Sequence, residues 1–488
     1  MFFSVYTLGC KLNQLETEAV TDAFCREGFT FIPWNVSKKG SAAPWLMVIN
    51  TCTVTSMAEQ KARRFIRKLL RDYPAMCLII TGCYAQVEQA ALSALEIREH
   101  KTPGRLFVIP GEIKDRLLDL PQVLTGAVQP MLPQLIASWL DSFSSGSLSN
   151  EAEDGAFRLQ PENFASHSRA FLKVQDGCDR RCAYCRVSIA RGKSRSLGAG
   201  EVLKALKSLE QRGFSEAVIA GVNITQYQDA DVPLDLVGLL DFLLSKTETI
   251  RLRLSSLEPD WLTQVRLADF SRILAYPRIR PHFHLSVQSG STGIIAKMAR
   301  TYTPADIERA VTLFRSVRQD PFLACDIIAG FPGETEEDFE KTFALCESIG
   351  FAWIHAFPFS RRPGTAAYDF PDRVSERDAA KRVERLTELA RKGRREYLNR
   401  WEGKEVEAIV EADSESMNRP HGVSRLIPAV SENYLKLLVA CGDGPVPAPG
   451  SRVCCRISAG EIPGGQVSEG SRFDAMAELC SKPLDLHV

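Results

Sequence analysis

Three cysteines stand close together in the middle of the chain, in the pattern C-x3-C-x2-C formed by Cys178, Cys182 and Cys185. Three thiolates at this spacing can hold three irons of a four-iron, four-sulfur cubane and leave the fourth iron open, whereas a cluster that only carries electrons normally takes four cysteines. An open iron is a place where a small molecule can bind and react. The alternative interpretation is a zinc knuckle that takes its fourth ligand from elsewhere in the chain.

A second set of cysteines follows three short apolar runs in the N-terminal region. These are Cys10, Cys52 and Cys83, which come after residues 3–8, 46–49 and 77–80. Each apolar run is followed by a helical pattern, and this alternation predicts a doubly wound parallel sheet with covering helices. Since the carboxyl ends of parallel strands share one edge of the sheet, we expect the three cysteines to meet there in a second site with an open position. Taken singly, each would be a core residue by default.

The central region predicts an open, partial (β/α)6 version of the eight-stranded barrel. Six strand-like runs are separated by amphipathic patterns such as 201–212, 303–317 and 336–349. The runs cover residues 170–174, 217–220, 250–254, 282–287, 322–328 and 353–357. The cluster of Cys178 follows the first strand, so we expect it at the carboxyl-terminal mouth.

The remaining boundaries follow from composition. We expect an N-terminal domain over residues 1–125, a Ser/Gly-rich linker over 126–168, the barrel over 169–370 and a basic helical connector over 371–402. Short strands and turns over 403–470 predict a small β-barrel of the oligonucleotide-binding kind, followed by a tail over 471–488. The basic run 391–395 fits a solvated helix face and an RNA contact equally well.

Charge and hydropathy narrow the setting in which the chain works. Its 60 basic and 60 acidic residues cancel, so any nucleic-acid binding must use local basic patches. No apolar run suits a membrane span and the start does not resemble a signal peptide, so we expect a cytosolic protein without a membrane partner. Fourteen cysteines in a reducing compartment then indicate metal ligation by some of them. The other eight are interpreted as small buried hydrophobes: Cys25, Cys77, Cys325, Cys346, Cys441, Cys454, Cys455 and Cys480.

These regions together resemble the methylthiotransferase family of radical S-adenosylmethionine (SAM) enzymes, over nearly the whole chain. The C-terminal region is similar to the RNA-binding TRAM domain of that family. The other matching segments are 7–18, 50–52, 82–83, 171–178, 190–196, 284–290 and 326–335. One departure is the run 186–189 after Cys185, where family members often carry an Ile-Pro-Tyr-like run.

The resemblance implies two 4Fe-4S clusters. The one on Cys10, Cys52 and Cys83 carries sulfur, and the one on Cys178, Cys182 and Cys185 binds and cleaves SAM. It also implies three kinds of partner: the tRNA anticodon stem-loop, an electron donor such as flavodoxin or ferredoxin, and a sulfur source. Candidate SAM contacts, each of which has an ordinary reading as a turn, cap, packing or solvated residue, are Tyr184, Gly221, Asn223, Glu258, Gln288 and Arg300.

The substrate is indicated by the residues after the first cysteine. The stretch Lys11, Leu12 and Asn13 resembles the residues found at this place in the enzymes that methylthiolate C2 of N6-threonylcarbamoyladenosine at tRNA position 37. Enzymes for isopentenyladenosine usually have Gln-Met-Asn there, and those that modify an aspartate of ribosomal protein S12 usually have Pro-Lys-Asn. Both of these substrates stay open as alternatives, as does a non-catalytic, zinc-stabilised RNA-binding protein.

Overall fold

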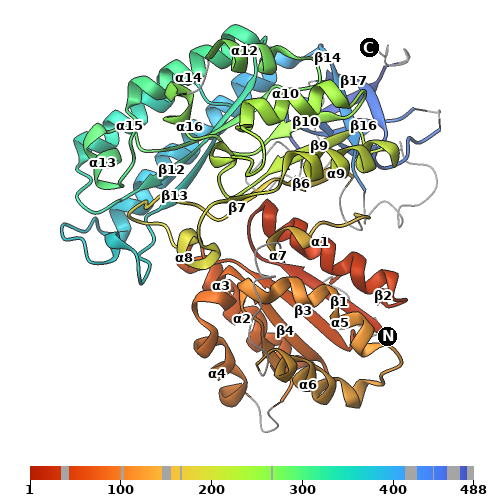
Figure 1. The fold of residues 1–488 in the computed structure, drawn as a ribbon. Helices are drawn as coiled ribbons and strands as arrows, with labels where there is room; N and C mark the ends of the chain where they lie inside the picture. The colour runs from red at the N-terminus through yellow and green to blue at the C-terminus, as the bar shows by residue number, and fades with distance from the viewer. Residues whose placement is uncertain are drawn as a thin grey trace. The chain divides into compact units, whose positions relative to one another are not determined.

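The computed structural model describes residues 1–34, 43–99, 104–144, 155–164, 168–264, 267–412, 426–442, 445–458 and 473–480 (Figure 1). The chain divides into two units. Unit 1 comprises residues 1–165, 173–197 and 360–368, and unit 2 comprises residues 166–172, 198–359 and 369–488. The loop that carries Cys178, Cys182 and Cys185 therefore belongs to the same unit as the N-terminal region.

Unit 1 is built on a parallel sheet with the strand order β2-β1-β3-β4-β5. Side chains alternate across β3: Leu46 and Val48 pack into the core beside helix α1, while Met47 and Ile49 pack into the core beside α2. Helices therefore cover both faces, which confirms the doubly wound sheet. The elements are β1 (Phe2–Thr7), α1 (Lys11–Arg26), β2 (Thr30–Phe31), β3 (Leu46–Thr51), α2 (Ser56–Asp72), β4 (Cys77–Gly82) and β5 (Leu106–Val108).

The expected linker over 126–168 contains a packed helix, α6 (Leu132–Ser144). Its apolar residues Leu132, Ile136 and Trp139 recur at helical spacing and are buried in the same core as Phe3. This part of the chain is therefore not a linker, and residues 145–154 lie outside the described residues. The other elements of unit 1 are α3 (Cys83–Val87), α4 (Gln89–Glu99), η1 (Gly111–Leu118), α5 (Leu120–Leu124), η2 (Gln129–Met131), α7 (Gly155–Arg158), β7 (Gln175–Asp176), α8 (Val187–Arg191), β8 (Arg195–Ser196) and η5 (Ala366–Tyr368).

Unit 2 contains the expected six-stranded, open barrel. Its strands form two parallel three-stranded sheets, β10-β9-β6 and β11-β12-β13, and isolated bridges such as Leu257 to Leu285 join the two. The strands are β6 (Ala170–Lys173), β9 (Glu216–Ala220), β10 (Arg251–Leu254), β11 (His282–Gln288), β12 (Phe322–Ala329) and β13 (Trp353–Pro358). The helices are α9 (Ala199–Gln211), η4 (Ile224–Gln226), α10 (Leu236–Lys246), α11 (Trp261–Gln264), α12 (Leu267–Ala275), α13 (Thr292–Lys297), α14 (Pro304–Val317) and α15 (Glu336–Ile349).

A closed five-stranded barrel ends the described chain, with the strand order β14-β15-β16-β18-β17. Its last strand, β18, lies beyond residue 470 and pairs with both β16 and β17 to close the barrel. The barrel therefore extends into residues 471–488, which were expected to be a tail. Residues 431–439 form the end of β15, a turn with Tyr434 at φ 65°, and most of β16. The elements are α16 (Glu376–Trp401), β14 (Glu405–Val410), β15 (Leu426–Ser431), β16 (Lys436–Ala440), β17 (Arg452–Ser458) and β18 (Ala475–Leu479).

The basic run of α16 does not form a uniform charged surface. Arg394 is buried, and its Nε lies 3.1 Å from the Asp474 carboxylate, so this side chain takes part in the fold. Arg395 is exposed. Tyr434 packs on His282 with ring centroids 4.2 Å apart and lies over the Arg253 guanidinium, so it is part of the interior contacts of unit 2. No helix among the described residues is long and apolar enough to cross a membrane.

Candidate functional site

The three N-terminal cysteines lie at the carboxyl edge of the parallel sheet. Cys10 precedes α1, Cys52 follows β3, and Cys83 opens α3 directly after β4. Gly9, at φ 145°, lies so close to Cys52 that a Cβ added to Gly9 would be 2.9 Å from the Cys52 Cβ. Burial, together with the charges of Cys10 and Cys83, raises the pKa of the Cys52 thiol to about 12. The fold therefore places the three thiols at one edge of the sheet, close enough for the charges of Cys10 and Cys83 to affect the pKa of Cys52.

Asn13 connects the loops that carry two of these cysteines. Its amide nitrogen donates to the Asn50 side chain at 3.2 Å and to the Thr51 carbonyl at 3.0 Å, just before Cys52. Its side-chain oxygen lies 3.5 Å from the Cys10 sulfur. The asparagine is fully buried, so these bonds satisfy its polar atoms in the interior. Asn13 therefore holds the loops of Cys10 and Cys52 together and helps to build the cysteine site.

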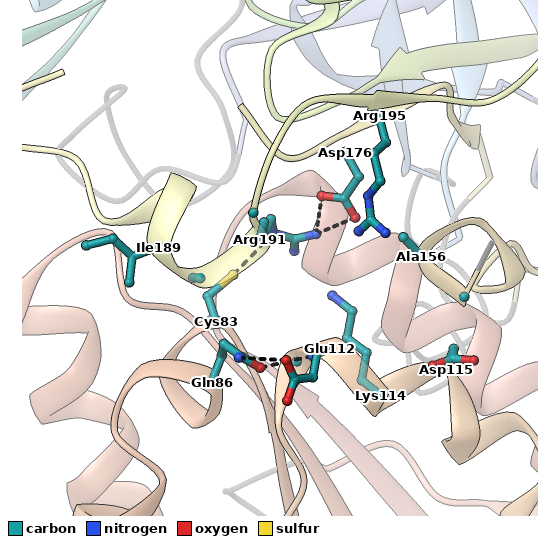
Figure 2. Close-up of a pocket in the computed structure, with 14 residues that line it drawn as sticks. Cys83, Gln86, Glu112, Lys114, Asp115, Ala156, Asp176, Ile189, Arg191 and Arg195 are labelled. Atoms are coloured by element: carbon teal, nitrogen blue, oxygen red, sulfur yellow. Dashed lines mark hydrogen bonds and ion pairs between the residues drawn. The ribbon is translucent and has the colours of Figure 1, made fainter. Parts of the chain in front are cut away.

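Arg191, at the end of α8, reaches the same site from the loop of the central cysteines. Its Nε donates to the Cys83 sulfur at 3.2 Å, and its Nη2 donates to the Asn13 side-chain oxygen at 3.1 Å. Its Nη1 lies 2.9 Å from Glu16 and 3.1 Å from Asp176. Figure 2 shows the guanidinium directed between Cys83 and the Asp176 carboxylate. One buried side chain therefore links the two cysteine-bearing parts of unit 1.

Two lysines complete a buried charge cluster around Arg191. Lys114 lies 2.5 Å from Glu16, and Lys173 contacts both Glu16, at 3.3 Å, and Asp176. Burial alone raises the pKa of each carboxyl group, but the three cations outweigh it and hold both pKa values well below the usual range. Three cations face two carboxylates, so the cluster carries one excess positive charge beside Cys83. That charge favours anionic sulfur ligands at this edge of the sheet.

A cavity of about 300 Å³ adjoins this cluster. Figure 2 shows the charged side chains that surround it. It is lined by both polar groups and backbone, including Cys83, Lys114, Asp176, Arg191 and Arg195. Its size suits a small polar ligand next to the thiol.

The central cysteine loop is held by backbone contacts within unit 1. Gly177 has a φ of 72° and passes so near Lys193 that a Cβ on it would lie 1.8 Å from that carbonyl oxygen, so only glycine fits. The Cys178 amide donates to the Gly192 carbonyl at 3.0 Å, and the Cys185 amide donates to the Cys182 carbonyl at 3.1 Å. All three cysteines are partly exposed. The loop therefore presents three thiols on a fixed backbone.

Arg186, where the sequence departs from the family pattern, fastens this loop to the N-terminal region. Its guanidinium lies 3.0 Å from Glu88 and 3.6 Å from Glu59. Glu59 also pairs with Arg362, whose Nη2 donates to Thr53 at 2.9 Å. The departing residue therefore takes part in packing the loop against the N-terminal region. These pairs could not be predicted from the sequence, because their members are far apart in the chain.

Five of the six expected SAM contacts lie in unit 2: four lie at or shortly after the ends of strands β9, β10 and β11, and Arg300 follows helix α13. Gly221 follows β9, and Asn223 caps η4 by accepting a bond from the Thr225 amide at 3.2 Å. Gln288 ends β11 with a φ of 62°. Glu258 and Arg300 form a buried ion pair, so neither is the solvated charge of its ordinary reading. The sixth, Tyr184, lies in the cysteine loop of unit 1 and is partly exposed.

Comparison with known proteins decides the family. Residues 172–346 match the radical SAM superfamily, and residues 3–100 match the uncharacterized protein family UPF0004. The chain is 41% identical to the threonylcarbamoyladenosine tRNA methylthiotransferase MtaB of Treponema pallidum, over 93% of this chain and 97% of that protein. It is 33% identical to the MtaB of Aquifex aeolicus, over 83% of this chain and 91% of that protein. The chain belongs to the radical SAM methylthiotransferases.

A second kind of tRNA enzyme is also among the relatives of this methylthiotransferase. The tRNA-2-methylthio-N(6)-dimethylallyladenosine synthase of Chlorobaculum tepidum is 30% identical, over 84% of this chain and 87% of that protein. The predicted family is thus confirmed. Membership implies an iron–sulfur cluster and SAM. The three partly exposed thiols on the fixed backbone of the central loop fit such a cluster.

The methylthiotransferase also has a polar group inside the barrel, centred on His284 of β11. The Ser256 hydroxyl and Nδ1 of His284 are 2.6 Å apart, and Nε2 of His284 lies 3.3 Å from the Asp326 carboxylate. His284 therefore shares a hydrogen bond with Ser256 through Nδ1 and has the Asp326 carboxylate beside Nε2, whereas His282 packs on Tyr434. The alternation of the two histidines along β11 was the only signal, and it does not identify partners on neighbouring strands.

Proposed function

We propose that this methylthiotransferase attaches a methylthio group to C2 of N6-threonylcarbamoyladenosine in tRNA. The substrate class is that named for the MtaB of Treponema pallidum, which is 41% identical over 93% of the chain. The observation that carries the chemistry is the arrangement in unit 1. Two sets of three cysteines occupy one unit, and Arg191 from the loop of the second set donates to Cys83 of the first.

We further propose that each cysteine set holds one 4Fe-4S cluster, with Cys10, Cys52 and Cys83 in one and Cys178, Cys182 and Cys185 in the other. When bound, these clusters and SAM supply sulfur and a radical strong enough to act on the unactivated C2–H bond of adenine. Arg191 orients the Cys83 sulfur, and the excess charge of its cluster offsets the negative charge of the thiolates.

The same proposal gives roles to residues of unit 2. Gly221, Asn223, Glu258, Gln288 and Arg300, with Tyr184 of unit 1, would bind SAM. The buried pair of Glu258 and Arg300 supports this role, because each charge fixes the other in one orientation at the end of a barrel strand.

The partner of this site is the anticodon stem-loop of tRNA, where a base can be turned out of its stack. The C-terminal barrel acts as the TRAM-like RNA-binding part, together with exposed basic residues such as Arg395 and Arg181. An electron donor such as flavodoxin or ferredoxin and a separate sulfur source complete the reaction, in the cytoplasm.

Two substrates can be distinguished by one experiment. The dimethylallyladenosine relative makes the isopentenyl-type adenosine the second candidate. Nucleoside analysis of tRNA from a strain that lacks the gene, with and without the gene restored, reports which adenosine loses its methylthio group. Loss of 2-methylthio-N6-threonylcarbamoyladenosine alone supports the proposal. Loss of the dimethylallyl product supports the second candidate, and unchanged tRNA contradicts both and favours the ribosomal protein.

A further inference from the structure

Two cysteines on the outer face of the C-terminal barrel have no role in its core. Along β17 the side chains alternate, so that Val453, Cys455 and Ile457 are buried in the barrel core while Cys454 and Arg456 lie outside. Cys455 therefore fills the core as expected from the sequence. Cys454 does not fill the core, so apolar packing does not account for a cysteine at this position.

The strand register places Cys454 opposite another outward-facing cysteine. Strands β17 and β18 are antiparallel and pair Cys455 with Leu479, which puts Cys480 directly across from Cys454. The Cys480 amide donates to the Cys454 carbonyl at 2.9 Å. Cys480 is partly exposed like its partner. Two thiols thus lie side by side on the outer surface of the barrel, one on β17 and one directly after β18.

A carboxylate from the third strand completes this group. On its other side β17 pairs with β14, and Glu405 is placed diagonally to Cys454 on the same outer face. One ligand atom from each of Glu405, Cys454 and Cys480 lies within 4.8 Å of the other two. The Cys454 sulfur and Oε2 of Glu405 are 4.0 Å apart. Three strands therefore contribute three metal-ligating atoms to one point.

The distances and charges of this group suit zinc. A tetrahedral zinc site with bonds of about 2.3 Å to sulfur and about 2.1 Å to oxygen places its donors roughly 3.5 to 3.8 Å apart, so small side-chain rotations suffice. Two thiolates and a carboxylate carry three negative charges, which a divalent ion and Arg456 would balance. Arg456 Nη2 already donates to Oε1 of Glu405 at 2.7 Å, which leaves Oε2 directed at the thiol.

We propose that Glu405, Cys454 and Cys480 bind one zinc ion that ties β18 to β17 and β14, with a water molecule as its fourth ligand. The ion is structural: it holds the strand that closes the barrel. A disulfide between the two cysteines is the competing reading, and the reducing conditions that iron–sulfur enzymes require disfavour it. This site is separate in the chain from all six cysteines assigned to clusters.

The test uses the full-length enzyme with its clusters reconstituted, under anaerobic conditions. The protein is incubated with zinc chloride, passed through a column in the presence of a weak competing chelator, and analysed for zinc by mass spectrometry. The wild type is expected to retain one zinc per chain more than Cys454→Ser or Cys480→Ser. The control Cys25→Ser changes an exposed cysteine on α1 and is expected to retain as much zinc as the wild type.

A second measurement separates binding from a folding defect in the variants. Zinc should slow hydrogen exchange of the β18 amides about tenfold or more in the wild type, and change it in neither serine variant. X-ray absorption at the zinc edge should show sulfur among the ligands. Equal zinc in the wild type and both variants would overturn the proposal. So would a Cys454 to Cys480 disulfide in the anaerobically isolated protein, which would instead identify a redox pair.

Discussion

Replacing Arg191 by methionine is expected to destabilise unit 1 by about 3 kcal/mol. Breaking a buried ion pair by removing one partner typically costs about 3 to 5 kcal/mol. The lower end applies here, because Lys114 and Lys173 still face Glu16 and Asp176 after the guanidinium is gone. The hydrogen bonds to Cys83 and Asn13 are lost as well.

Native-state hydrogen exchange measures this loss in one unit of a two-unit chain. The slowest amides of β3 and β4 are expected to exchange roughly 100-fold faster in Arg191→Met, since each 1.4 kcal/mol corresponds to about a tenfold change. Arg191→Lys keeps the charge but not the fork of donors, so we expect an intermediate effect. Iron bound per chain should fall in Arg191→Met because the site of Cys10, Cys52 and Cys83 is weakened, while the site of Cys178, Cys182 and Cys185 keeps its iron.

The matched control is Arg272→Met, which removes an arginine that pairs with Asp241 at the surface. Both side chains of that pair are about half exposed, so its loss should cost at most about 1 kcal/mol. If Arg191→Met and the control leave the exchange of β3 and β4 equally unchanged, the buried charge cluster does not stabilise unit 1 and the reasoning is refuted.

Four further outcomes are expected. Alanine at Cys178, Cys182 or Cys185 should abolish the release of 5′-deoxyadenosine from SAM by the reduced enzyme, and normal release from any of the three would sink the assignment. Alanine at Cys10, Cys52 and Cys83 together should lower the iron content by about half while that release persists; unchanged iron would show that they are core cysteines. Arg395→Glu should weaken binding of the anticodon stem-loop and reduce its salt dependence, while Lys207→Glu on α9 should not; equal affinities would remove α16 from the RNA surface. The pKa of Glu216 is lowered to about 2, because Arg253, Arg280 and Arg169 outweigh its burial. Its contribution to the free energy of unfolding of unit 2 is therefore complete above about pH 5 and is lost as the pH falls towards 2. Urea unfolding from pH 6 to pH 3 should show this loss in the wild type and not in Glu216→Gln.

The sequence predicts well those elements whose signals are local. The barrel strands were found to within about two residues, since each is a run of apolar residues between helical patterns. Helices α14 and α15 begin where Thr303 and Thr335 form capping boxes with Asp306 and Asp338, a signal that spans only three residues. The cysteines were placed at the sheet edge because parallel strands all end there.

Elements without a local signal were missed or misassigned. Strands β2 and β5 have two and three residues, which is too short for any period to show. The apolar stripe of α6 was hidden beside a Ser/Gly-rich run. The role of Arg191 depends on Cys83, Glu16 and Asn13, which are separated from it by 108, 175 and 178 residues. A single sequence carries no record of such distant pairs, so a basic residue there reads as solvated.

The central cysteine loop belongs to unit 1, and this determines which parts of the chain can be exchanged between related enzymes. Gly177, Arg186 and Arg191 fit the loop to partners that lie in the loop itself or in the N-terminal region. A barrel transplanted from another radical enzyme would keep these contacts only if its loop carried the same residues. The N-terminal region and this loop therefore depend on each other for packing, although almost a hundred residues lie between Cys83 and Cys178. A chimera designed from this enzyme should be cut outside 173–197, so that the loop travels with the N-terminal sheet.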